Sequence, residues 1–221
     1  MFSSVKEAVI FLTEKPDVAI ITTVSSLEKL IPQVEEVASF GIPIISTCEE
    51  LSYPWKLQPK LSDKLDQICK KYNVSCLGTG VNPGFLMDYL PSVFTSISKE
   101  IDYISVERIQ DATPRRIPFQ KKIGAGLTLD EFKKKEATGT LRHVGLQESV
   151  YLLANSIDLE LDKVTESLEP VITEKVVASD AIKVKKGDAR GVEQVAYGFA
   201  NGICKIKMHF KAAIREHRSF D

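Results

Sequence analysis

The chain has 221 residues, of which 43% are hydrophobic and 27% are charged, and its formal net charge at pH 7 is -1. A near-neutral chain of this composition is typical of a globular protein with its own core, and its charge gives no reason to expect nucleic-acid binding. Its apolar stretches are shorter than the roughly 20 residues that span a bilayer, and its first 15 residues follow an amphipathic helical pattern rather than a secretory signal. We therefore expect a cytoplasmic protein with no nucleic-acid partner and no membrane partner.

Strands and helices alternate through residues 1–98. The expected strands are Val18–Thr23, Ile42–Thr47 and Val74–Leu77, and the expected helices are Ser25–Phe40, Ser62–Tyr72 and Gly84–Ser98. Short apolar runs rich in β-branched residues, separated by helices, predict a parallel, doubly wound sheet. Ligands bind such sheets in the crevice at the carboxyl ends of the strands, where this sequence places its polar and glycine-rich segments.

The sequence changes after Ser98 to longer β-rich runs. These runs are 103–109, 164–177 and 192–210, with a turn at 187–190 and helical stretches at 129–137 and 144–157. We predict an α/β fold in which a partial Rossmann-like parallel sheet is followed by an α+β domain with a mostly antiparallel sheet. The expected domains are residues 1–98, a partial dinucleotide-binding domain, and residues 99–221, a domain for substrate binding or oligomerisation.

The run GTGVNPGFLMD at residues 78–88 joins the third expected strand to the next helix. Its glycines tolerate positive φ and have no Cβ, so we expect this turn to let a ligand approach closely. Pro83 is suited to a helix start, and Phe85, Met87 and Leu90 are expected to anchor the helix that follows. The spacing of these glycines does not match the GxGxxG fingerprint for dinucleotides, so the motif alone does not establish a cofactor.

Two adjacent carboxylates, Glu49 and Glu50, follow the second expected strand and precede the aromatic residues Tyr53 and Trp55. A carboxylate that is partly desolvated beside aromatic surface can serve as a general base near neutral pH. The other interpretation is a solvated helix start, where the helix dipole favours glutamate. Position alone favours neither.

Two features of the C-terminal part could contact a ligand. One is a polar and basic cluster, made of Arg115, Arg116, Gln120, Lys121 and Lys122. It could hold a carboxylate or phosphate, although a solvated basic face is the more common outcome. The other is His143, near a helix start and the flexible Gly145; a structural role is the more common one for a single histidine.

The four cysteines are Cys48, Cys69, Cys76 and Cys204. They form no CxxC pair and accompany no histidine cluster at metal-ligand spacing, so we expect unpaired, mostly buried thiols and no metal. The two glutamates beside Cys48 should raise the pKa of its thiol, which makes it a poor nucleophile.

Five motifs, taken in order, carry a resemblance to a known family. They are DVAIITTVSS, IISTCEELSYPW, GTGVNPGFLMD, RRIPFQKKIGAGLT and LRHVGLQES. Together they resemble the 2,4-diaminopentanoate dehydrogenases, which belong to a wider group of NAD(P)-dependent amine dehydrogenases similar in fold to dihydrodipicolinate reductase. The resemblance covers nearly the whole chain. By the standard of that family, we expect this chain to lack the N-terminal GxGxxG segment and the C-terminal end.

The resemblance also implies which residues act. The motif of the catalytic acid/base is matched by Glu49 and Glu50, without deciding between them. Positions that line the nicotinamide side of NAD or NADP are matched by Thr22, Thr23, Ser25, Gly80 and Asn82. The weaker candidates for orienting the substrate are Arg116, Gln120 and His143.

The activity implied is that of an oxidoreductase of amino-acid metabolism, which converts a diamino acid such as 2,4-diaminopentanoate to its oxo acid with release of ammonia. Without the backbone N–H groups of a phosphate-binding loop, cofactor binding should be severely weakened. An alternative is therefore a catalytically incomplete homologue that serves as a binding or subunit-association module. A hydrolase or lyase that uses the glutamate pair ranks third, and a homodimer is the expected assembly.

Overall fold

The computed structural model describes residues 2, 4–141 and 143–216. The chain divides into two compact units, residues 1–98 with 151–159 and residues 99–150 with 160–221. The chain changes unit after Ser98, where the sequence indicates a boundary, and residues 151–159 group with the first unit although they lie in the second expected domain. The roles expected of the two domains stay predictions. Among the described residues, no helix is long and apolar enough to cross a membrane.

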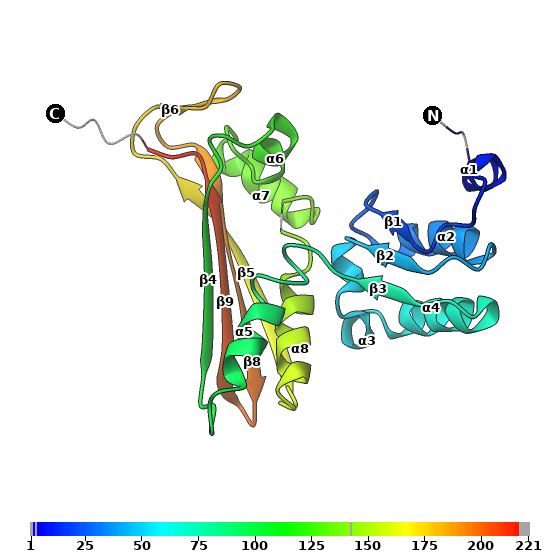
Figure 1. The fold of residues 1–221 in the computed structure, drawn as a ribbon. Coiled ribbons are helices and arrows are strands. Elements are labelled where there is room, and N and C mark those ends of the chain that lie inside the picture. The colour runs from blue at the N-terminus through cyan, green and yellow to red at the C-terminus, as the bar shows by residue number, and fades with distance from the viewer. Residues whose placement is uncertain (1, 3, 142, 217–221) are drawn as a thin grey trace. The chain divides into compact units, whose positions relative to one another are not determined.

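The first unit is built on a parallel three-stranded sheet, sheet A, with strand order β1-β2-β3 (Figure 1). Its elements are α1 (Val5–Phe11), β1 (Ala19–Ile21), α2 (Leu27–Ala38), β2 (Ile44–Ser46), the 3-10 helix η1 (Glu49–Leu51), α3 (Pro54–Leu57), α4 (Pro59–Tyr72), β3 (Cys76–Gly78) and α5 (Tyr89–Thr95). The predicted Rossmann-like parallel sheet is confirmed, although each strand is shorter than its apolar run.

The core of the first unit lies between sheet A and its helices. Leu27, Leu30 and Val34 are spaced three and four residues apart on α2, so they share one face of the helix, and each is fully buried. This face packs with Ile44 of β2 in one apolar cluster. Gly41 adopts a φ of 66° just past the helix, the left-handed conformation in which many helices end.

The helix predicted over residues 84–98 is shorter than expected, because α5 begins only at Tyr89. Gly84 has a φ of 117°, which no helix accommodates. The carboxylate of Asp88 accepts hydrogen bonds from the N–H groups of Gly84 (2.9 Å) and Tyr89 (2.6 Å) and so caps the helix from just before it. Pro83 therefore lies in a turn rather than at a helix start. Phe85 is 44% exposed, with its ring 6.5 Å from that of Tyr89, whereas Met87 is buried as expected.

The second unit contains a four-stranded sheet, sheet B, with strand order β4-β9-β8-β5 (Figure 1). Its elements are β4 (Ile104–Asp111), α6 (Ile117–Lys122), α7 (Leu129–Ala137), the first part of α8 (Leu146–Ser156), β5 (Lys163–Ile172), β6 (Val177–Ala178), β7 (Lys183–Val184), β8 (Ala189–Ala200) and β9 (Ile203–Ala213). Within sheet B, two strand pairs are antiparallel and only β4 with β9 is parallel. The predicted mostly antiparallel sheet is therefore confirmed.

Four segments of the second unit differ from the prediction. The expected run 164–177 is interrupted, because β5 ends at Ile172 and β6 begins at Val177. The expected run 192–210 is a hairpin of two strands, because Asn201 and Gly202 both adopt positive φ and reverse the chain. Helix α8 starts two residues late because Gly145 has a φ of 97°. Helix α6 was not among the expected elements; its basic residues were interpreted only as an anion-binding cluster or a solvated basic face.

The two faces of sheet B differ in character. The face that carries Met208 and Phe210, here called the inner face, is buried, and Gly198 on it comes so close to Val150 of α8 that a Cβ there would lie 2.9 Å from Val150 Cγ1. The opposite, outer face carries His209 and Lys211, which are partly exposed.

Candidate functional site

Backbone hydrogen bonds hold the carboxyl ends of the three strands of sheet A together. The N–H of Thr47 donates to the carbonyl of Ile21 (3.2 Å), and the N–H of Thr79 donates to the carbonyl of Ser46 (2.9 Å). The buried hydroxyl of Ser46 also donates to the carbonyl of Ile21, at 2.9 Å. The polar segments that follow the strands therefore start from one edge of the sheet, as a parallel arrangement requires.

Glu50 of η1 is held by two other segments. Its Oε2 accepts a hydrogen bond from the N–H of Leu27, the first residue of α2, and another from Nε2 of Gln58, both at 2.8 Å. The side chain of Ser26, at the N-cap position of α2, makes no capping hydrogen bond. Glu50 thus supplies the cap from another element, in a place where the helix dipole favours a negative charge.

Glu49 precedes Glu50 on η1, directly beyond the carboxyl end of β2, and its side chain is partly buried. Among the described residues, none donates a hydrogen bond to its carboxylate or forms an ion pair with it. The structure therefore separates two residues that the sequence leaves equivalent. Glu50 fastens η1 to α2, and Glu49 has a carboxylate available for proton transfer.

Cys48 is buried beside the glutamate pair, and the pKa of its thiol is raised to about 11. Burial is the main cause, and the negative charges of Glu50 and Glu49 add to it, so the direction predicted is confirmed while the main cause differs. Such a thiol is protonated at neutral pH and is not a nucleophile. The four cysteines are free, and only Cys48 is fully buried.

The glycines of residues 78–88 serve a different purpose from the one expected. A Cβ on Gly78 would lie 2.6 Å from the carbonyl oxygen of Leu51, and a Cβ on Gly84 would lie 2.3 Å from the backbone nitrogen of Gly80. Both are far inside van der Waals contact, so these glycines let η1 pack on β3 and let the turn fold onto itself. The bare backbone is covered by the chain and not left open for a ligand.

The other residues expected on the cofactor side divide by exposure. Thr22 and Thr23 are exposed just after β1, and the Thr23 hydroxyl donates to Oε1 of Gln33 at 2.6 Å. Ser25 is partly buried, and its carbonyl accepts from the N–H of Glu50 at 3.3 Å. Asn82 is partly buried inside the turn. The exposed threonines are therefore the accessible members of this group.

In the second unit, the side-chain amide of Gln120 is hydrogen-bonded to protein groups, so its presence needs no substrate to explain it. Its side chain is 1% exposed, and its Nε2 donates to the carbonyls of Thr113 (3.0 Å) and Arg115 (2.7 Å). Its Oε1 accepts from the hydroxyl of Ser179 at 2.6 Å, which ties α6 to the turn between β6 and β7. Arg116, by contrast, is exposed at the start of α6 and caps nothing with its side chain.

His143 lies against the inner face of sheet B. Its N–H donates to Oε1 of Gln194 (2.8 Å), its carbonyl accepts from Nε2 of Gln194 (3.0 Å), and its ring centroid lies 4.5 Å from that of Phe210. Burial, with the positive charges of Arg108 and Lys122, lowers the pKa of His143 to about 4. At neutral pH the imidazole is uncharged, so it can offer a substrate a hydrogen bond but not an ion pair.

This lowered pKa predicts a pH dependence of stability. Between the ordinary value of 6.5 and about 4, the unfolded chain binds a proton at His143 that the folded chain does not, so the free energy of unfolding falls as the pH falls through this window. The expected loss is about 3 kcal/mol when the pH reaches the folded value. Urea denaturation from pH 7 to pH 4 measures it, and His143→Gln should remove that part of the slope whereas His209→Gln should keep it. A proton NMR titration of His143 with a midpoint near its ordinary value would contradict the prediction.

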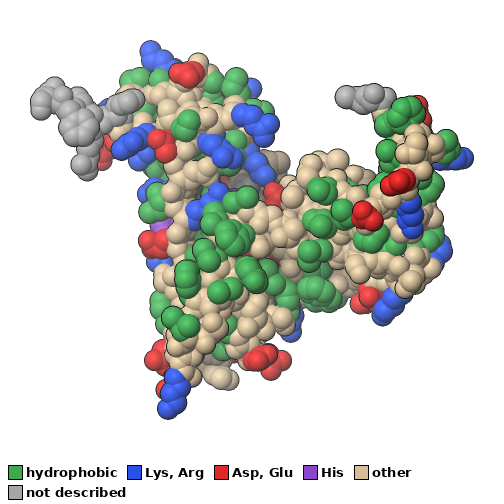
Figure 2. All heavy atoms as spheres, in the orientation of Figure 1, with side chains coloured by type: hydrophobic (Ala, Val, Ile, Leu, Met, Phe, Trp, Pro, Cys, Tyr) green, Lys and Arg blue, Asp and Glu red, His purple; other side chains and the backbone are tan. Residues whose placement is uncertain are grey.

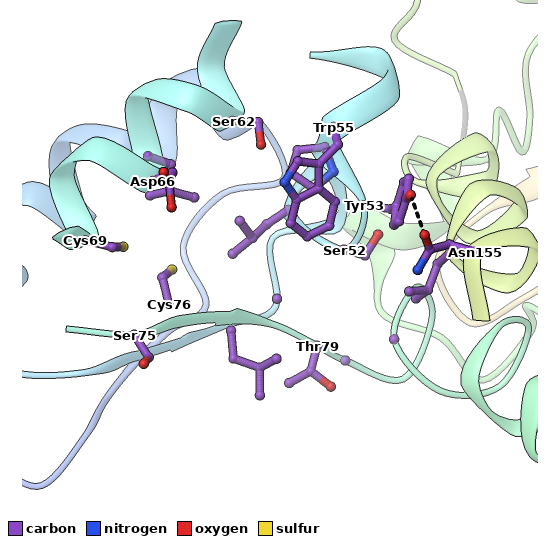
Figure 3. Close-up of a pocket in the computed structure, with 18 of the residues that line it drawn as sticks. Ser52, Tyr53, Trp55, Ser62, Asp66, Cys69, Ser75, Cys76, Thr79 and Asn155 are labelled. Atoms are coloured by element: carbon purple, nitrogen blue, oxygen red, sulfur yellow. Dashed lines mark hydrogen bonds between the residues drawn. The ribbon is translucent and has the colours of Figure 1, made fainter. Parts of the chain in front are cut away.

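A cavity of the first unit lies along β3 and α4, with a volume of about 1120 Å³ (Figure 3). The hydroxyl of Tyr53 donates to Oδ1 of Asn155 at its rim (3.1 Å), and the Asp66 carboxylate on its wall is paired with Lys70. Its walls combine aromatic, aliphatic, thiol and hydroxyl groups with this ion pair. Of the predicted site residues it contains only Gly80, so the cavity is separate from the glutamate pair.

Sequence reasoning missed two residues of functional interest. Asp88 is fully buried and organises the turn at residues 78–88; an aspartate just before a helix is an N-cap signal that could have indicated it. Arg108 lies on the inner face of sheet B near His143, and no sequence signal distinguishes it from its neighbours. Among the described residues, no group of three or more His, Cys, Asp or Glu side chains is arranged to hold a metal.

The fold and the strand-end geometry define an α/β protein with a Rossmann-like sheet followed by an α+β unit. A structure of the same fold is the amine dehydrogenase from Mycobacterium smegmatis, which has a TM-score of 0.75 and 20% sequence identity, over 93% of this chain and 61% of that one. The family described as the 2,4-diaminopentanoate dehydrogenase C-terminal domain matches residues 85–219, more than half of the chain. The chain belongs to this family.

A curated relative agrees with this assignment. The 2,4-diaminopentanoate dehydrogenase of Acetoanaerobium sticklandii is 34% identical over 200 residues, which make up 89% of this chain and 57% of that protein. The chain thus spans little more than half the length of the curated relative.

Proposed function

We propose that this chain takes part in an NAD- or NADP-dependent oxidation of an amine, and that its substrate is a diamino acid such as 2,4-diaminopentanoate. One observation carries the proposal: in a member of this family, the carboxylate of Glu49 lies at the joined carboxyl ends of a parallel sheet and has no hydrogen-bond or ion-pair partner among the described residues. The name of the curated relative supports the substrate class. Because the chain covers only part of that relative, the activity of the whole protein is part of the proposal.

The residues described here fit one end of a nicotinamide dinucleotide. The exposed Thr22 and Thr23 follow β1, and the glutamate pair follows the neighbouring strand β2. In this proposal the threonine hydroxyls contact the nicotinamide and its ribose. The glycines of the turn do not fit the pyrophosphate. Backbone atoms occupy the space where a Cβ would lie at Gly78 and Gly84, so these residues cannot form a phosphate cradle. Binding of the pyrophosphate would have to come from elsewhere than these glycines.

In this proposal Glu49 takes a proton from the substrate ammonium, which frees the lone pair that the iminium needs. NAD or NADP, when bound, would supply the acceptor for the hydride that leaves the carbon bearing the amine. Once Glu49 has passed its proton to solvent, it takes another from the water that attacks the iminium. The products are an oxo acid, ammonia and the reduced cofactor. Glu50 keeps Glu49 in place by holding η1 against α2.

A second candidate is a catalytically incomplete homologue that acts as a binding or subunit-association module. The lack of a phosphate cradle among these glycines favours it, and so does the outer face of sheet B. There His209 lies between Glu107 and Glu193, at 3.6 and 2.8 Å, and Lys211 pairs with Glu193 at 3.2 Å. Alternating charges of this kind are self-complementary across a two-fold axis, so we propose a homodimer through this face.

Isothermal calorimetry with NADH and with NADPH tests the first proposal. We expect one of them to bind, and the bound protein to reduce the oxidised cofactor when 2,4-diaminopentanoate is added. Absence of binding at about millimolar cofactor, with the chain folded by circular dichroism, would overturn the oxidoreductase proposal for this chain and favour the second candidate.

A further inference from the structure

Arg108 of β4 lies on the inner face of sheet B beside two aromatic rings. In the register of the sheet it is paired with Phe210 of β9, and its Cζ lies 5.6 Å from the centroid of the Phe210 ring. The His143 ring packs against the same Phe210, with 4.5 Å between centroids. Phe210 is 1% exposed, so the guanidinium is held over a rigid, buried aromatic side chain.

Among the residues that the structure describes, no carboxylate neutralises the charge of Arg108. Its one hydrogen bond among the described residues is a long one, 3.5 Å, from Nη2 to Oε1 of Gln110, and within the same described residues no carboxylate forms an ion pair with it. Glu166 of β5 also lies on the inner face. Its Oε1 accepts a hydrogen bond from Gln194 Nε2 at 2.8 Å. A half-buried cation without a counter-charge is unfavourable unless a ligand supplies one.

Further positive charge surrounds this position. Burial lowers the pKa of Arg108, and Arg115 lowers it further, which places the two guanidinium groups within electrostatic reach of each other. Lys122 of α6 acts on His143 in the same way as Arg108 does. Figure 2 shows Lys and Arg side chains gathered over α6 and α7 in the second unit. An anion that entered here would meet several cations and an uncharged imidazole.

We propose that Arg108 binds the carboxylate of an amino-acid substrate, with its guanidinium plane fixed by Phe210. A guanidinium donates two parallel hydrogen bonds to a carboxylate, and stacking on an aromatic ring orients it for that geometry. This assignment rests on the proposed function, because the class of ligand, an amino acid, is that of the proposed substrate. It also explains why no carboxylate of the described residues pairs with this cation.

The test compares two ligands that differ only in the acid group. Calorimetry measures binding of 2,4-diaminopentanoate and of 2,4-diaminopentane, with and without NAD+, to the wild type and to Arg108→Gln. We expect Arg108→Gln to weaken the diamino acid about 10- to 100-fold and to leave the diamine unchanged, since only a charge-assisted pair is lost. Arg108→Lys should recover only part of the affinity because an ammonium does not bind bidentately. Lys207→Gln, on the outer face of the same sheet, is the matched control and should bind as the wild type.

Several outcomes would overturn the inference. They are an unchanged affinity in Arg108→Gln, an equal loss for both ligands, no binding of the diamino acid by the wild type, and competition by inorganic phosphate that depends on Arg108, which would indicate a general anion site. Failure of the proposed function is distinguishable. Arg108-dependent binding without any cofactor reduction supports the subsite and rejects the oxidoreductase, whereas reduction that is indifferent to Arg108 does the reverse.

Discussion

Glu49→Gln is expected to lower kcat for amine oxidation by about 100- to 10,000-fold, the usual contribution of a general acid/base. Glutamine keeps the size of the side chain and its hydrogen-bonding capacity but cannot take a proton from the substrate ammonium. Initial rates of nicotinamide reduction with 2,4-diaminopentanoate measure the effect. The change should be in kcat, with KM altered much less, because the group acts on the transition state.

The neighbouring glutamate provides the control. Glu50→Ala removes the acceptor for the N–H of Leu27 and for Gln58, so it should lower the free energy of unfolding by about 1 kcal/mol, as the loss of a helix cap does. Its kcat should stay much closer to that of the wild type than the kcat of Glu49→Gln. If Glu50→Ala loses turnover and Glu49→Gln keeps it, the two roles are assigned the wrong way round.

Gly84→Ala is expected to lower the free energy of unfolding of the first unit by about 3 kcal/mol or more. Two penalties combine at this position: a φ of 117°, which side chains rarely adopt, and a Cβ that would lie 2.3 Å from the nitrogen of Gly80. Neither can be relieved by rotating a side chain, because the obstruction is backbone. Denaturant unfolding followed by the fluorescence of Trp55, the single tryptophan of the chain, reports on this unit.

Gly41→Ala separates the two penalties. Gly41 belongs to the same unit and has a φ of 66°, but its Cβ would meet only the Nζ of Lys15 at 3.0 Å, at the far end of a flexible side chain. Its expected cost is about 1 kcal/mol, from backbone conformation alone. Equal losses for the two variants would show that crowding inside the turn contributes nothing.

Much of the first unit was predictable because the signals are local. The alternation of apolar strands and amphipathic helices follows from residue spacing, and the left-handed conformation of Gly41 follows from its place after a helix. The helix expected from residue 84 was misplaced, because Gly84 was interpreted as a helix start while the cap is Asp88. The glycine-rich turn was expected to let a ligand approach closely, but what packs against these glycines is the backbone of the chain itself.

The candidate site was predictable only as a set of residues, not as a set of roles. Glu49 and Glu50 are identical in type and adjacent, and what distinguishes them is a hydrogen bond to Leu27, 23 residues away. The burial of Gln120 and the long hydrogen bond of Arg108 are likewise invisible in the sequence, since both depend on neighbours brought together by folding.

The amino-acid sequence by itself determined the class of fold, the order of its elements and the family resemblance, because periodicity, turn residues and motif order are properties of neighbouring positions. The tertiary structure alone decided which glutamate and which arginine have no counter-charge among the described residues. It also decided which glycines have backbone atoms in the space of a Cβ, and why His143 is uncharged at neutral pH. Each of these depends on burial and on contacts between distant segments, such as the one that joins His143 to Gln194 across 51 residues.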